Sequence, residues 1–186
     1  AKRQPGSAFK PFVYMAALKE GLSPSTLVLD APYVVDQGPG LPKWKPANYT
    51  EEFYGLTTMR TGIEKSRNLM TVRLADKIGM NKIIEIAKDF GIEENINDQL
   101  SMSLGSGLVT LIDITNAYAI ISNGGIKIEP RIINSIYSKE GRNLFNSNSK
   151  ECINCKLKRI SKNYDIPNII DNFEYSIDPK IAYQIT

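Results

Sequence analysis

The spacing of apolar residues changes once along this chain of 186 residues, and that change restricts the folds it can adopt. In several segments up to about residue 125, apolar side chains recur every three to four positions, as in amphipathic helices. From 127 to 137 they alternate with polar residues, and the turn 139–142 leads into Asn143-Leu144-Phe145, a pattern typical of a β-hairpin. We therefore expect an α+β fold that is mostly helical, with one hairpin.

Five helices are predicted before the hairpin and one after it. Glycines close several of these segments, and Thr110 with Asp113 forms a capping pair at the start of the fifth. Asp178-Pro179 marks the start of the sixth. The predicted ranges are 7–20, 56–65, 69–78, 81–90, 110–123 and a last helix from 178 onward. The proline-rich and glycine-rich segment 23–49 is predicted to be a loop with a short strand at 33–35, and 146–172 to be irregular.

Composition excludes several classes of function. No run of eighteen apolar residues occurs, so no transmembrane helix is expected. The net charge of +3 and the short basic cluster 156–162 do not indicate nucleic-acid binding. Histidine is absent, which removes Ser-His-Asp and Cys-His mechanisms and histidine-ligated metals. Cys152 and Cys155 are too few for a zinc site, and a local disulfide and two free thiols remain open; no cofactor is expected.

The segment from Arg3 to Phe12 carries the strongest chemical signal. Pro5-Gly6 closes a loop, and Ser7 stands where the N-cap residue of the next helix belongs. Lys10 follows one helical turn later, so its amine should lie on the same face as the Ser7 hydroxyl. A hydroxyl beside an amine that can take its proton is a candidate activated nucleophile. Pro11 has no N–H for the Ser7 carbonyl, so a tight or irregular first turn is expected.

Ser66-Arg67-Asn68 forms a second candidate cluster, between two helical segments. Residues two apart do not share a helix face, so Ser66 and Asn68 can converge only in a bend between helices. The spacings of both clusters recur at Ser147–Lys150 and Ser161–Asn163, inside polar segments that are typical of loops. Only Ser7 follows a turn and opens an amphipathic helix, so the Ser7–Lys10 pair is a stronger candidate than the pair at Ser147–Lys150.

Taken in order, these stretches resemble the transpeptidase domain of class A (bifunctional) penicillin-binding proteins. The matching stretches are 3–12, 44–49, 65–72, 100–106 and 117–125. The resemblance covers roughly residues 1–146 and implies the transpeptidase fold shared by penicillin-binding proteins and serine β-lactamases. It also implies that these residues hold an incomplete sheet of that fold. It divides the chain into a helical subdomain with the site motifs and the hairpin (1–146), followed by an irregular segment and the start of a further helix (147–186).

The resemblance also implies a reaction. It implies a D,D-transpeptidase that cross-links peptidoglycan stem peptides through a serine acyl-enzyme, and that β-lactams acylate. Ser7 would be the nucleophile and Lys10 its proton acceptor, while Ser66 would pass a proton to the leaving amine and Asn68 would hold an amide of the bound peptide. A lysine base must be largely neutral, so its pKa must fall from about 10.4 towards 7, at a cost of roughly 4–5 kcal/mol.

Parts of the family pattern are missing from these 186 residues. The family's third motif, Lys-Ser/Thr-Gly on a strand, supplies a second cation and part of the oxyanion hole, and no lysine here is followed by Ser-Gly or Thr-Gly. The glycosyltransferase domain and membrane anchor of such proteins are also absent. We expect a partial, nearly inactive domain that self-associates through exposed apolar surface. Its parent is expected in the bacterial inner membrane, with this domain on the periplasmic side.

Two other functions remain open. Glu93 and Asn97 have the Glu-x-x-x-Asn spacing of a base that could activate water, which would make the protein a serine hydrolase of the β-lactamase or carboxypeptidase kind. A non-catalytic sensor or scaffold that binds β-lactams would need the same acylation step. A persistent acyl-enzyme would favour the transpeptidase, and fast turnover would favour the hydrolase.

Overall fold

The computed structural model describes residues 1–36, 38–40, 42–92, 97–147, 151–153, 168–170 and 173–186. The chain has two compact units, one formed by residues 1–128 with 175–186 and the other by residues 129–174. The predicted division at residue 146 stays a prediction. No helix among the described residues is long and apolar enough to cross a membrane.

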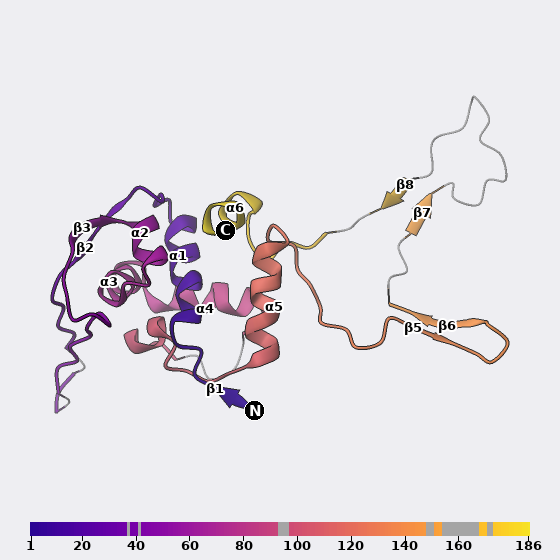
Figure 1. Cartoon of the computed structure of the whole chain (residues 1–186), viewed down its shortest axis with the longest axis horizontal. Coiled ribbons are helices and arrows are strands. Elements are labelled where there is room, and N and C mark those ends of the chain that lie inside the picture. Colours follow the sequence, from indigo (N-terminus) through magenta and orange to yellow (C-terminus); the bar gives the residue numbers. More distant parts are fainter. Residues whose placement is uncertain (37, 41, 93–96, 148–150, 154–167, 171–172) are drawn as a thin grey trace, which may run out of the picture. The chain divides into compact units, whose positions relative to one another are not determined.

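Helix α1 (Lys10–Lys19) is the centre of the first unit. All of its side chains from Phe12 to Leu18 are buried, since none is more than 8% exposed. It packs against α2 (Met59–Glu64), α3 (Asn68–Ile78), α4 (Met80–Asp89) and α6 (Pro179–Ile185), and Figure 1 shows it among these helices. A helix that is apolar on every side must be surrounded in this way to be stable in water.

Ser7 does not cap this helix, so its prediction as the N-cap residue is wrong. It lies in the 3-10 helix η1 (Gly6–Phe9), and the N-cap of α1 is Phe9, which makes no capping side-chain hydrogen bond. Because Pro11 has no N–H, it cannot donate to the Ser7 carbonyl; the N–H of Lys10 donates to that carbonyl instead. The tight first turn predicted from Pro11 is confirmed.

The segment 56–65 begins as a strand, which the sequence analysis missed. Strand β3 (Gly55–Thr58) pairs antiparallel with β2 (Leu27–Asp30), inside the predicted loop 23–49. Helix α2 starts only after Thr58, whose hydroxyl accepts a hydrogen bond from the N–H of Thr61. The adjacent β-branched residues Thr57 and Thr58 favour an extended backbone before this cap.

The prediction of a short strand at residues 33–35 is wrong. Only Val35 forms a bridge there, to Trp44, and the two residues exchange a pair of backbone hydrogen bonds of 2.9 Å each. The segment between β2 and β3 is otherwise irregular where the structure describes it.

The remaining helices agree with the predictions to within one or two residues. Helices α3 and α4 are separated by Gly79 alone, and α5 (Leu111–Ser122) begins after Thr110, whose hydroxyl accepts from the N–H of Asp113 at 3.2 Å. Helix α6 begins after Asp178, whose carboxylate accepts from the N–H of Lys180 at 2.7 Å. Local capping groups therefore determine where α5 and α6 start.

The segment before α1 is held against residues 105–118. Strand β1 (Lys2–Arg3) pairs antiparallel with β4 (Val109–Thr110), just before α5. The Gln4 side chain donates to the Ser106 carbonyl at 3.0 Å. The phenol of Tyr118 donates to the Ala8 carbonyl at 3.0 Å, so contacts lie on both sides of Ser7.

Gly105 makes the tightest of these contacts. It follows the 3-10 helix η2 (Leu100–Leu104), has a left-handed φ of +75°, and its carbonyl accepts the N–H of Gly6 at 3.2 Å. A Cβ atom at Gly105 would lie 2.1 Å from the Gly6 carbonyl oxygen. The backbones can approach this closely only because position 105 has no side chain.

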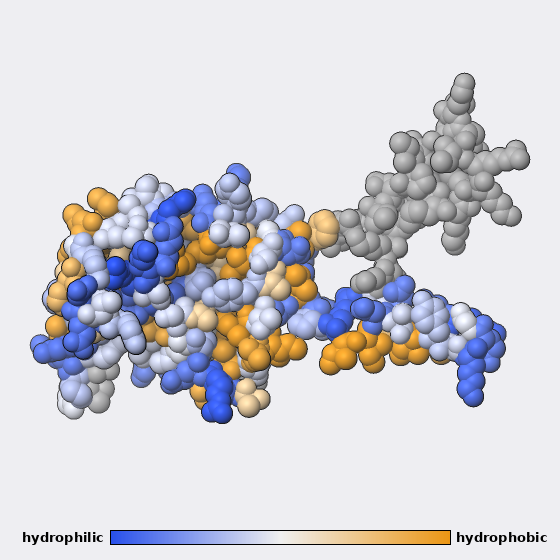
Figure 2. All heavy atoms as spheres, viewed as in Figure 1, coloured by the Kyte–Doolittle hydropathy of each residue, from blue (hydrophilic) through white to orange (hydrophobic). Residues whose placement is uncertain are grey.

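The second unit contains two antiparallel strand pairs. Strands β5 (Ser135–Tyr137) and β6 (Asn143–Asn146) form the predicted hairpin, but its first strand is shorter than the alternation from 127 suggested. Figure 2 shows apolar side chains gathered along it, and Ile136, Leu144 and Phe145 are exposed. Strands β7 (Glu151–Ile153) and β8 (Asn168–Ile170) also pair, so the prediction of an irregular segment over 146–172 is wrong there.

Several predicted features lie outside the described residues. They are the proposed water-activating Glu93, the basic cluster 156–162, the second copies of both motifs (Lys150 and Ser161–Asn163) and the thiols of Cys152 and Cys155. The described strands form four separate two-stranded sheets, and the α+β fold class predicted from the sequence is confirmed.

Replacing Gly105 by Ala is expected to destabilise the protein by about 1–3 kcal/mol more than replacing Gly91 by Ala. Both glycines have a left-handed φ, +75° and +83°, so alanine at either position is strained by its φ. Nothing lies within 4 Å of a Cβ at Gly91, whereas a Cβ at Gly105 meets the Gly6 backbone. Denaturant unfolding of the two variants measures the difference, and equal losses would show that this close approach contributes nothing.

Candidate active site

The buried amine of Lys10 joins two distant parts of the chain. Its Nζ donates to the backbone carbonyl of Ser66 at 2.6 Å, to the Ser66 Oγ at 2.9 Å and to the Asn68 Oδ1 at 2.6 Å. An ammonium has three N–H donors, so these contacts use all of them. The structure therefore brings together three of the four residues singled out from the sequence, although 56–58 positions separate them.

Burial changes the acid–base chemistry of this amine. Lys10 is 2% exposed, and its desolvation lowers the pKa of the ammonium from 10.5 to about 8. Removing a cation from water favours its neutral form. A lysine base requires a lowered pKa, and the pKa of Lys10 is lowered. It lies about one unit above the value of 7 expected for a largely neutral base.

The three acceptors around Lys10 differ in what they can do when the amine loses a proton. A neutral amine has two N–H groups and one lone pair, so one of the three hydrogen bonds is lost or reversed. The carbonyl of Ser66 and the Oδ1 of Asn68 can only accept. The Ser66 hydroxyl can also donate, so of these three it is the group through which a proton can move to or from Lys10.

Ser66 lies in the predicted bend between α2 and α3. Its φ is +52°, in the left-handed region that non-glycine residues rarely adopt. In this conformation both the carbonyl and the hydroxyl of Ser66 accept hydrogen bonds from Lys10. Backbone strain of this kind costs about 1–2 kcal/mol and persists only where surrounding contacts hold it.

Ser7 lies one turn before Lys10, in η1, and its side chain is exposed. An exposed hydroxyl is accessible to a substrate in solution, as a nucleophile must be. The turn that carries it is anchored through Gly6 to Gly105 and through Ala8 to Tyr118.

Asn48 is a site component whose role the sequence analysis missed. It is 4% exposed, and its Oδ1 accepts from the backbone N–H groups of Asn68 at 2.9 Å and Leu69 at 3.2 Å, the first two residues of α3. The Asn68 Nδ2 in turn donates to the Ala47 carbonyl at 2.8 Å. Both contacts come from the stretch 44–49, which the family resemblance had already singled out.

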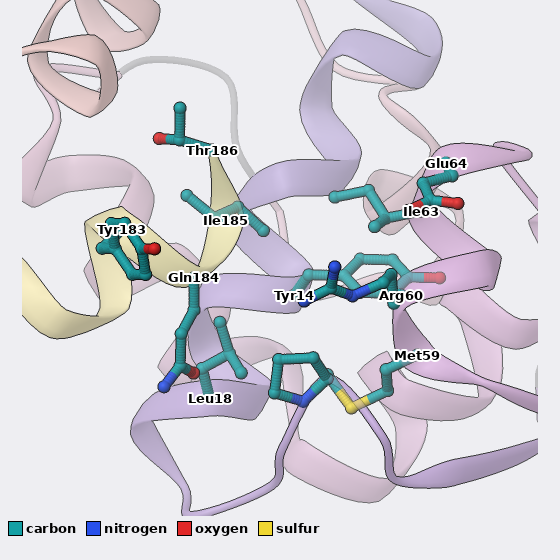
Figure 3. A pocket seen from close by; sticks show the side chains of 11 residues that line it. Tyr14, Leu18, Met59, Arg60, Ile63, Glu64, Tyr183, Gln184, Ile185 and Thr186 are labelled. Atoms are coloured by element: carbon teal, nitrogen blue, oxygen red, sulfur yellow. The ribbon is translucent and has the colours of Figure 1, made fainter.

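A separate pocket of about 390 Å³ lies between α1, α2 and α6 (Figure 3). Tyr14, Met59 and Ile185 contribute to its walls, whereas Ser7, Lys10, Ser66 and Asn68 do not line it. The candidate site is therefore assigned from the chemistry of the Lys10 cluster rather than from the presence of a cavity.

Comparison with known proteins places this chain in a family. The model of the penicillin binding protein transpeptidase domain matches residues 1–164. The chain is 45% identical over 187 aligned residues to penicillin-binding protein 1A of Rickettsia conorii, which covers all of this chain and 24% of that protein. The chain thus spans about a quarter of the length of the curated relatives it matches.

Solved structures show the same fold. The crystal structure of penicillin-binding protein 1A from Haemophilus influenzae superimposes with a TM-score of 0.81 at 31% identity, covering 99% of this chain and 29% of that one. The PonA1 protein from Mycobacterium tuberculosis, solved in complex with penicillin V, gives a TM-score of 0.79 at 22% identity, covering 100% and 46%. This chain belongs to the penicillin-binding protein transpeptidase domain family.

Proposed function

We propose that these residues form part of a serine D,D-transpeptidase that cross-links peptidoglycan stem peptides. The observation that supports it most is the contact of the buried Lys10 amine with Ser66 and Asn68, one turn after the exposed Ser7. The family match adds the reaction class, and the relative solved in complex with penicillin V adds β-lactams as ligands.

In the proposed reaction, neutral Lys10 accepts the proton of the Ser7 hydroxyl as its oxygen attacks the carbonyl of a terminal D-Ala-D-Ala. The C–N bond breaks, and the leaving D-Ala amine receives a proton through the Ser66 hydroxyl. An amine from a neighbouring strand then attacks the acyl-enzyme and frees Ser7, which makes the transfer ping-pong. The contacts of Ser66 support its part, because its hydroxyl is the one partner of Lys10 able to donate as well as accept.

Asn68 is proposed to hold an amide of the bound peptide. Its Oδ1 accepts from Lys10, and its Nδ2 donates to the Ala47 carbonyl. The amide nitrogen has two N–H groups, so it can hold Ala47 and also donate to a peptide carbonyl. Asn68 would thereby couple the position of the substrate to that of the base.

The proposal concerns the longer protein of which these 186 residues can form part. The Lys-Ser/Thr-Gly motif, which is not in this sequence, would supply a second cation and an oxyanion donor. Loss of one oxyanion donor alone costs about 10²–10³ in rate, so the 186 residues by themselves are proposed to be nearly inactive. The parent is proposed to lie in the bacterial inner membrane, with this domain on the periplasmic side.

Acylation by a labelled penicillin tests the nucleophile. The longer protein is expected to gain one penicilloyl group at Ser7, found by mass spectrometry of its peptides, and S7A is expected to gain none. The 186-residue chain is expected to react at least about 100-fold more slowly. Equally rapid acylation of the short chain would contradict its proposed inactivity. Label on another residue would contradict the role of Ser7, and fast loss of the label would favour a hydrolase.

The pH dependence of acylation tests the base. With the pKa of Lys10 near 8, its neutral fraction rises as pH increases, so the acylation rate is expected to increase about tenfold between pH 7 and pH 9. K10R should lose acylation throughout this range, because a guanidinium stays protonated. A rate that is independent of pH, or a K10R variant that still reacts, would exclude Lys10 as the proton acceptor.

Two substitutions of Ser66 separate its hydroxyl from its backbone strain. S66A and S66G both remove the hydroxyl, so both are expected to lower the acylation rate to the same extent. Because glycine adopts a φ of +52° without strain, S66G should be about 1–2 kcal/mol more stable than S66A, measured by denaturant unfolding. Acylation at the parental rate in S66G would show that the hydroxyl has no part in proton transfer.

A further inference from the structure

We infer that Asp30 is a positioning residue for this site, which holds the Ser66–Asn68 bend from the side opposite Lys10. The inference rests on the proposed function. Asp30 lies at the end of β2 and is 0% exposed, and none of the hydrogen bonds of Lys10 described above involves it. A buried carboxylate is costly unless it is paired, so the contacts of Asp30 indicate its role.

The first link from Asp30 to the bend passes through Asn48. The Asp30 Oδ1 accepts from the Asn48 Nδ2 at 2.8 Å, and the same Nδ2 donates to the Glu52 carbonyl at 3.0 Å. On its other side, Asn48 accepts from the N–H groups that open α3 at Asn68 and Leu69. Every hydrogen-bonding atom of this buried amide is therefore engaged.

Asp30 also determines which way the Asn48 amide faces. An ionised carboxylate can only accept, so the amide nitrogen of Asn48 must face it. The amide oxygen then faces α3, where it meets two N–H donors. A flipped amide would place its oxygen against the carboxylate and its N–H groups against those of α3, with repulsion at both ends. The carboxylate thus fixes the acceptor that positions Asn68.

The second link passes through Arg67, the middle residue of the bend. Its Nε lies 4.0 Å from the Asp30 Oδ2, and neither atom has a hydrogen-bond partner among the described residues, so this link is an attraction between charges. The guanidinium carbon lies 3.3 Å from the centroid of the Tyr54 ring. This side chain is 15% exposed, so the attraction between the two charges is only weakly screened by water. Ser66 and Asn68 contact Lys10 while Arg67 contacts Asp30, so the bend is held on both sides.

This arrangement explains how a left-handed serine can persist at the site. The φ of +52° at Ser66 needs neighbours that prevent the bend from relaxing. Of the two residues that follow it, Asn68 is tied to Asp30 by hydrogen bonds through Asn48, and Arg67 is attracted to Asp30 by charge alone. If Asp30 is removed, the bend can move away from Lys10, and Ser66 and Asn68 lose the geometry that proton transfer requires.

The test uses the longer, catalytically complete protein and measures the maximal rate of acylation and the apparent penicillin affinity at 25 °C. D30A removes both links, and a misplacement of about 1 Å at a reacting group can cost up to 10²-fold, so its maximal rate should fall about tenfold or more. D30N keeps an acceptor for Asn48 but loses the charge facing Arg67. Its maximal rate should be intermediate, about three- to tenfold below that of the parent.

N116A is the matched control. Asn116 is a partly buried amide, and it donates from α5 to the Ile128 carbonyl at 2.9 Å rather than to a residue of the site. It should lose stability while acylating at the parental rate. A parent that is not acylated at Ser7 would refute the proposed function. If the parent is acylated and a folded Asp30 variant reaches a maximal rate within twofold of the parent's, the positioning role is refuted. If D30A does not fold, the maximal rate of D30N decides.

Discussion

The hydrogen bonds from the Lys10 amine to Ser66 and Asn68 are the interaction on which the rest of the site depends. They join the start of the central helix to a bend more than fifty residues later. The amine that makes them is buried, and this desolvation lowers the pKa of Lys10 to about 8. One buried group thus holds two segments together and has an altered acid–base behaviour.

Both partners in this interaction are held by further contacts. On one side, β1 pairs with β4, Gly6 packs against Gly105 and Tyr118 donates to Ala8, which together position the turn that carries Ser7. On the other side, Asp30 and Asn48 contact the bend. A site built on a loop needs supporting contacts of this kind, because a loop has no repeating hydrogen-bond ladder of its own.

The elements that sequence analysis predicted well are those that local groups determine. Thr110 and Asp178 cap α5 and α6, and the effect of Pro11 on the first turn of α1 could be foreseen because it depends on one missing N–H. Strands β2 and β3 were missed because each is stabilised by the other across a connection of 24 residues, from 31 to 54. Strands β7 and β8 were missed for the same reason, because they pair with each other within the segment predicted to be irregular.

The sequence by itself determined helices α3 to α6, the one-turn spacing of Ser7 and Lys10, and the family to which the chain belongs. Capping, periodicity and motif spacing act within a few residues, so they can be read from the order of residues. Only the tertiary structure decided that Lys10 is buried against Ser66 and Asn68, and that Asn48, paired with Asp30, contacts the bend at Asn68. Burial and long-range hydrogen bonds depend on which segments pack together, and that choice is made by the whole core rather than by any local pattern.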